Sequence, residues 1–118
     1  MNSIYLKAKI HGAKITGKKL HYDGSIEVDM DILDKAGIGA YQQVQVLNFN
    51  TGARFITYTL PGKRGSKTFA LAGPAARKGE IGDRIIVIAY AQMTEEEARN
   101  HKPTIVMMDD DNNIKESK

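Results

Sequence analysis

The sequence predicts a mainly β domain, folded as a closed or nearly closed β-barrel with two or three short helices. Three observations lead to this class. Apolar and charged residues alternate along several short segments, which is the period of a strand with one buried face. Turns rich in glycine separate these segments, and the few segments with a helical pattern are all short. Together these features favour a barrel.

The bulk composition limits the function classes. At 118 residues the chain fits one domain, which we predict over 1–118, with a flexible tail over 110–118. A net charge of +3 suits a small acidic substrate and is a weak argument for nucleic acid. The lack of cysteine excludes a disulfide framework and a thiolate nucleophile. The N-terminal residues lack the apolar core of a signal peptide, and no run is long enough to span a membrane, so we expect a cytoplasmic protein.

The first part of the chain predicts two strands and a short helix. Residues 4–16 and 25–29 have the strand pattern, with apolar and polar side chains in alternation. Residues 30–36 form the helix, because Asp29 is a suitable N-cap and Gly37 a suitable stop.

A hairpin is expected next. Val44, Val46 and Phe49 anchor its first strand, Asn-Thr-Gly at 50–52 is a turn signal, and the return strand covers 53–60.

The remaining elements are predicted from local signals. Residues 61–66 form a loop, 67–72 a strand, and 73–78 one helical turn that begins with a proline. The apolar, β-branched run at 85–90 indicates a central, fully buried strand.

The C-terminal part adds a helix and a strand. A capping threonine and an acidic first turn predict a helix over 94–99. A last strand covers 104–108, and a solvated tail is expected from Asp109 onward.

Several weaker motifs do not indicate a site. Gly37-Ile38-Gly39 lacks the third glycine and the preceding strand of a dinucleotide loop. The basic loop at 63–67 is better explained as a solvated hairpin loop than as a phosphate site. The acidic run at 109–111 lacks the glycine and the final glutamate of a calcium loop. No metal site is expected, because the histidines lack the spacing of metal ligands: His11, His21 and His101.

The dipeptide Gly24-Ser25 lies between two predicted strands. A serine hydroxyl can attack the carbonyl of the peptide bond before it, and such proximity can lower a barrier by ~7–11 kcal/mol. Gly24 offers no side chain to block the attack and tolerates a strained backbone. Alone, however, a glycine–serine pair is usually only a turn.

Five segments together give this pair a function. Lys9-Ile10-His11 and residues 20–26, 50–58, 73–76 and 81–83 resemble those of the aspartate 1-decarboxylases, in the same order along the chain. The resemblance implies a double-psi β-barrel, made as an inactive proenzyme and usually assembled as a homotetramer.

The resemblance also implies the chemistry. Ser25 attacks the Gly24 carbonyl to give an ester, and elimination and hydrolysis leave one chain ending at Gly24 and another beginning with a covalent pyruvoyl group made from Ser25. That group forms a Schiff base with L-aspartate and serves as the electron sink for its decarboxylation to β-alanine and CO2, which supplies pantothenate synthesis.

Further residues receive roles by the same resemblance. Arg54 and Lys9 bind the retained carboxylate, for which the planar guanidinium is well suited. Tyr58 is the proton donor. Thr57 assists self-cleavage and borders the substrate, and Tyr22 has a positional role at the cleavage site. Three residues complete the substrate site: Gly73, Pro74 and Ala75.

Each of these residues also has an ordinary structural explanation. Without the resemblance, Arg54 and Lys9 are solvated strand residues and Tyr58 is a half-buried aromatic residue. Arg54 and Tyr58 share a strand face but their Cα atoms are ~13 Å apart, which is long for two groups that grip one aspartate. We therefore predict an active site between subunits, with Arg54 and Tyr58 serving different sites.

Three positions depart from the family pattern. Gly12 stands where arginine is usual, and Pro74, which has no N–H, replaces a frequent alanine. Ala72 stands where the family has asparagine beside the reacting centre. Our hypothesis is that cleavage still occurs, but slowly.

Two other functions are considered. Ala72 is the main support for a non-catalytic β-barrel binding module in which Ser25 is uncleaved or poorly processed. A nucleic-acid binder draws only on net charge and the loop at 63–67, and the aromatic content of 7% gives little stacking surface.

Overall fold

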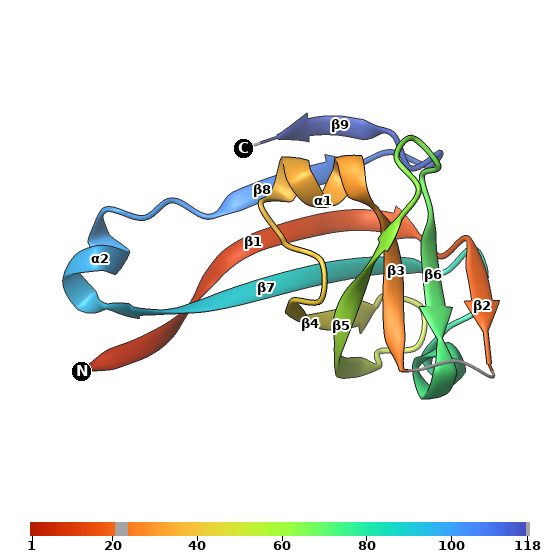
Figure 1. The fold of residues 1–118 in the computed structure, drawn as a ribbon, viewed down its shortest axis with the longest axis horizontal. Helices are drawn as coiled ribbons and strands as arrows, with labels where there is room; N and C mark the ends of the chain where they lie inside the picture. The colour runs from red at the N-terminus through yellow and green to blue at the C-terminus, as the bar shows by residue number, and fades with distance from the viewer. Residues whose placement is uncertain (21–23, 118) are drawn as a thin grey trace.

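The computed structural model describes residues 1–20 and 24–117. Within this part the strands form one nine-stranded mixed sheet in the order β2-β6-β3-β5-β4-β7-β1-β8-β9 (Figure 1). The elements in chain order are β1 (Asn2–Lys14), β2 (Gly17–Lys19), β3 (Ser25–Asp29), α1 (Met30–Ala36), β4 (Gln43–Asn48), β5 (Arg54–Gly62), β6 (Phe69–Ala72), the 3₁₀ helix η1 (Gly73–Lys78), β7 (Arg84–Thr94), α2 (Glu95–Arg99), β8 (Thr104–Met108) and β9 (Ile114–Ser117). The mainly β class with short helices is confirmed, and the arrangement is consistent with a double-psi barrel.

The sheet contains both parallel and antiparallel pairs, with three antiparallel pairs in succession from β5 through β4 and β7 to β1. Strand β3 runs parallel to β5 and antiparallel to β6, while β7 lies between β1 and β4 and is antiparallel to both. These pairings join segments that are far apart in the chain. The sheet packs around a core to which β1, β3, β4, β6, β7, β8 and α1 contribute, including Ile10, Ile26, Val28, Leu33, Val46, Phe69, Leu71, Ile85 and Val87.

Helix α1 begins and ends where the sequence predicts. The Asp29 side chain accepts a hydrogen bond from the Asp31 backbone N–H, and Gly37 ends the helix at φ 73°, a left-handed conformation that glycine adopts at little cost. The buried Asp29 carboxylate also accepts the backbone N–H groups of Gly65 and Lys67. One residue therefore caps the helix and anchors the loop before β6.

Helix α2 has the predicted capping box. The Thr94 side chain accepts from the Glu97 backbone N–H, and the Glu97 carboxylate accepts from that of Thr94. The described residues contain no helix that is long and apolar enough to cross a membrane.

The C-terminal segment differs from the tail expected over 110–118. Residues Ile114–Ser117 form β9, which pairs antiparallel with β8. The turn before it is fixed by Asn112, whose buried amide bonds the backbone of Lys14 and of Lys67. These partners are distant in sequence, so the acidic local composition gave no sign of them.

Strand β7 is central, as predicted, but it is not fully buried. It runs from Arg84 to Thr94, beyond the predicted end at residue 90. Ile86 is half-buried and Tyr90 is 40% exposed, because one face of the sheet formed by β1, β7, β4 and β5 is open. We call this the open face. In Figure 1, β1 and β7 also extend together beyond the rest of the sheet, toward α2.

Candidate active site

The residues around Gly24 and Ser25 form the first part of the candidate site. Gly24 directly precedes β3, whose parallel pairing with β5 sets Ile26 opposite Thr59. This register brings the Thr57 hydroxyl to the scissile carbonyl, and Thr57 Oγ1 donates a hydrogen bond of 3.1 Å to the Gly24 oxygen. Ser25 is completely buried. We call Gly24, Ser25, Thr57 and their contacts below the cleavage centre.

Two further elements enclose the cleavage centre. Strand β6 places Ala72 directly opposite Ser25 in an antiparallel pair. Cross-strand neighbours of this kind have Cβ atoms ~4.5–5.5 Å apart, so the residue at 72 is within side-chain reach, and its methyl group offers no hydrogen bond. Helix η1 supplies Pro74, whose ring packs beside Gly24: a Cβ added to Gly24 lies 3.4 Å from Pro74 Cδ. Gly73 and Ala75 are buried next to it in η1.

The side chains of β5 alternate between two environments. Thr57 contacts Gly24, whereas Arg54 and Ile56 are exposed on the open face. Tyr58 is half-buried and, by the strand period, shares the face of Arg54. Arg54 and Thr57 are three residues apart on one strand, so their Cα atoms are ~10 Å apart. Their side chains also point to opposite faces of the sheet.

Cationic and titratable side chains lie in two adjacent rows of the open face. Register pairs align His11, Ile86, Leu47 and Arg54 in one row across β1, β7, β4 and β5. The next row contains Lys9, Ile88, Gln45 and Ile56. We call Lys9, His11 and Arg54 the cation cluster. Beside it lies a cavity of about 290 Å³, lined by Leu47, Asn48, Phe49, Gly52, Ala53, Arg54 and Ile86.

His11 contributes little positive charge near neutral pH. Partial burial, and then the nearby Lys9 ammonium, hold the pKa of His11 below its usual value. Its ring packs edge-on against Phe49, with centroids 5.6 Å apart. In the described part of the chain its buried Nδ1 has no hydrogen-bond partner. The other two members of the cluster, Lys9 and Arg54, therefore supply most of its positive charge.

The predicted site residues thus fall into two groups. Gly24, Ser25, Thr57, Pro74 and Ala75 meet at the cleavage centre, while Lys9 and Arg54 lie on the open face. Tyr22 lies outside the described residues. Among those that are described, no three His, Asp or Glu side chains are grouped to hold a metal ion.

Comparison with known proteins decides the family. A family model described as aspartate decarboxylase matches residues 1–115. This chain belongs to the aspartate decarboxylase family. It is 48% identical to the aspartate 1-decarboxylase of Maricaulis maris over 97% of this chain and 94% of that protein. For the aspartate 1-decarboxylase of Chloroherpeton thalassium the identity is 53%, over 92% of this chain and 80% of the relative.

The sequence assigns no role to three residues in or beside the cation cluster of this aspartate decarboxylase family member. Gln45 bonds Arg54 directly, Tyr90 contacts Gln45, and His11 belongs to the cluster itself. The turn signal at 50–52 indicates that the strands on either side form a hairpin. That pairing places Gln45 on the same face of the sheet as Arg54. The position of Tyr90 depends on the long-range β4–β7 register and had no local signal.

Proposed function

We propose that this chain is a pyruvoyl-dependent aspartate 1-decarboxylase, which converts L-aspartate into β-alanine and CO2 after cleaving its own Gly24–Ser25 bond. One observation carries the proposal: the buried Ser25 follows a carbonyl that already accepts a hydrogen bond from Thr57. Family membership supports the same reaction, because the matched relatives are named aspartate 1-decarboxylase.

The cleavage centre is suited to self-cleavage. Ser25 Oγ attacks the Gly24 carbonyl carbon, the C–N bond breaks as its nitrogen gains a proton, and an ester results. Thr57 donates to the oxygen on which negative charge develops, which is the arrangement of an oxyanion hole. Loss of the Ser25 α-proton then expels the Gly24 carboxylate, and water replaces the remaining nitrogen as ammonia to leave the pyruvoyl group.

The structure fits a pyruvoyl group at this position. Ser25 is buried between β5 and β6, so a group made from it is shielded from water. When present, the pyruvoyl carbonyl reacts with the amino group of aspartate and accepts the electron pair released with CO2. The residues that border it are Thr57, Gly73, Pro74 and Ala75. Tyr58 supplies the proton that replaces CO2.

The carboxylate-binding role belongs to the cation cluster. The Arg54 guanidinium is exposed on the open face, where its planar fork can pair with a carboxylate through two hydrogen bonds. Lys9 adds a second cation on β1, in the row of the open face next to that of Arg54. We propose that Arg54 holds the carboxylate that L-aspartate retains, and that Lys9 is a second cation near the substrate.

The two groups face different sides of β5, which supports an active site shared between subunits. A second copy that sets its cation cluster against the cleavage centre supplies what one chain lacks. The open face also carries exposed apolar side chains suited to such contact, namely Phe49, Ile56 and Tyr90. The proposed assembly is the homotetramer implied by the resemblance. The cytoplasmic location stays a prediction from the N-terminal sequence.

The test is intact mass spectrometry of the purified protein combined with an assay for β-alanine. We expect two chains, one that ends at Gly24 and one that begins with the group made from Ser25. We also expect β-alanine to form from L-aspartate. Treatment with a carbonyl reagent should then abolish activity. A single uncut chain after long incubation, without β-alanine, contradicts the proposal and favours the binding module.

A further inference from the structure

Arg54 is held by one side chain from the neighbouring strand. Its Nη1 donates a hydrogen bond of 2.5 Å to Gln45 Oε1, the one side-chain partner of Arg54 among the described residues. Gln45 lies on β4, within the row of the open face that also contains Ile56 and Ile88. The position of the guanidinium therefore depends on the position of this amide.

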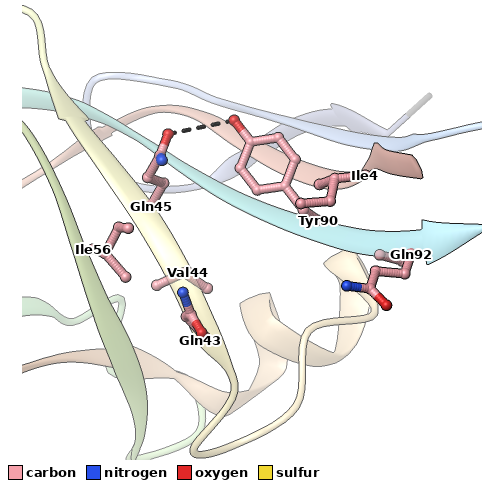
Figure 2. Close-up of a pocket in the computed structure, with 8 residues that line it drawn as sticks. Ile4, Gln43, Val44, Gln45, Ile56, Tyr90 and Gln92 are labelled. Carbon is pink, nitrogen blue, oxygen red and sulfur yellow. Dashed lines mark hydrogen bonds between the residues drawn. The ribbon is translucent and has the colours of Figure 1, made fainter. Parts of the chain in front are cut away.

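A second hydrogen bond fixes the amide itself. Tyr90 on β7 directs its hydroxyl to the same oxygen, Gln45 Oε1, at 3.4 Å (Figure 2). Two donors that converge on one oxygen hold the amide with its carbonyl toward Arg54. The shorter bond, from a charged donor, is the stronger of the two, and the Tyr90 contact is the weaker.

The chemistry of an amide suits a supporting residue for a substrate-binding arginine. A neutral carbonyl oxygen occupies one guanidinium N–H and leaves the positive charge of Arg54 intact. The remaining donors can still form the two-bond fork with a carboxylate. A glutamate at position 45 would instead form an ion pair with Arg54 and compete with an anionic substrate.

Arg54 and its partner Gln45 border two different hollows of the open face. One is the cavity of about 290 Å³ that Arg54 borders. The other is a cavity of about 410 Å³ whose lining includes Gln45 and Tyr90, together with Ile4, Gln43, Val44, Ile56, Ala91 and Gln92 (Figure 2). The bond between Gln45 and Arg54 therefore joins a residue of the larger cavity to a residue of the smaller one.

We infer that Gln45 is a positioning residue for Arg54, and that Tyr90 supports it by orienting its amide. The inference rests on the proposed function, in which Arg54 binds the retained carboxylate of L-aspartate. It predicts that changes at Gln45 alter substrate affinity and leave both self-cleavage and the chemical step unaffected.

The main test compares the cleaved, purified enzyme with its Gln45→Met and Gln45→Glu variants. Methionine keeps the length of the side chain and removes the acceptor, so KM for L-aspartate should rise by about 5- to 20-fold with kcat within twofold. Glutamate should raise KM further, and added salt should reduce that excess, because an exposed ion pair is screened. The inhibition constant of succinate, a dicarboxylate without an amino group, should rise in parallel with KM.

Two variants make the measurement specific. Gln43→Met changes a residue of the same strand that lines the larger cavity and has no bond to Arg54, so its KM should match the parent. Tyr90→Phe removes only a hydroxyl and should raise KM by about twofold, as fits a weak hydrogen bond. It tests the inference even if changes at position 45 prevent folding.

Arg54→Ala separates this inference from the proposed function. An unchanged KM in Arg54→Ala overturns the proposed role of Arg54. A raised KM in Arg54→Ala, with Gln45→Met and Tyr90→Phe both at the parent value, overturns the positioning role alone. A fall in kcat with constant KM in the position 45 variants also overturns it.

Discussion

The cleavage centre and the cation cluster lie on one strand, β5, yet they differ in nearly every physical property. The cleavage centre is buried and is assembled by backbone pairing of β3 with β5 and β6. The cation cluster is partly exposed, lies across the open face, and depends on long side chains. A buried, backbone-defined centre can act within one chain, whereas exposed cations need a second surface to exclude water around a substrate. Self-cleavage and substrate turnover should therefore respond to different changes.

The largest expected effect is at Ser25. Ser25→Ala removes the attacking oxygen, so self-cleavage should be lost completely and no β-alanine should form. Intact mass should show one uncut chain. Because alanine fits a completely buried position next to Ala72, the variant should keep the parent melting temperature within a few degrees. Cleavage in this variant would show that another residue attacks the Gly24 carbonyl.

Thr57 should control the rate of cleavage. Thr57→Val keeps the branched shape and removes the donor to the Gly24 oxygen, so cleavage should slow by ~10²–10³-fold, the usual cost of losing one oxyanion donor. The rate is followed by intact mass from freshly made proenzyme. Thr51→Val is the matched control, since Thr51 lies exposed in the hairpin between β4 and β5, and it should cleave at the parent rate. Equal rates for the two variants would remove Thr57 from the cleavage mechanism.

The structure also shows which features were predictable from sequence. The caps of α1 and α2 depend on residues two to three positions apart, so Asp29, Gly37 and Thr94 were identified correctly. The Thr57–Gly24 bond joins residues 33 apart and requires the parallel β3–β5 register, which no local pattern encodes. The resemblance named Thr57 and Arg54, but only the three-dimensional pairing shows that they face opposite sides.

Strand β9 is the clearest difference between the predicted and observed fold. Its residues follow an acidic run that is typical of a solvated tail. The strand forms because β8 offers a free edge and because Asn112, at φ 57°, ties the preceding turn to Lys14 and Lys67. Asparagine tolerates this left-handed conformation better than most residues. Such long-range support cannot be read from local composition.

Arg54 should matter for turnover and not for cleavage. Arg54→Ala should cleave at the parent rate but lose ~10- to 100-fold in kcat/KM, as expected when a charged hydrogen-bonding partner is removed. Arg99→Ala is the control, because Arg99 lies on α2 and pairs only with Glu95 among the described residues.

Mixed assemblies test whether the two regions meet between subunits. Ser25→Ala retains Arg54 but has no pyruvoyl group, and Arg54→Ala retains the pyruvoyl group. Coexpression of the two should yield assemblies with more activity than either variant alone. Activity no higher than that of Arg54→Ala would place both regions of one chain in the same site.

The smallest expected effect is on pH dependence, and it concerns His11 of the cation cluster. Burial and Lys9 hold the pKa of His11 below about 6.5, its usual value in an unfolded chain. Between these two pKa values the unfolded chain binds more protons than the folded one. The free energy of unfolding should therefore fall as the pH is lowered through this window. Above about 6.5, His11 makes no contribution to the pH dependence of that free energy.

His11→Gln removes this contribution, so urea unfolding should show a smaller loss of stability between pH 7.5 and pH 5.5 in the variant than in the parent. Equal losses in both proteins would mean that His11 titrates alike in the folded and unfolded states, and the cation cluster would then carry a third charge at mildly acidic pH.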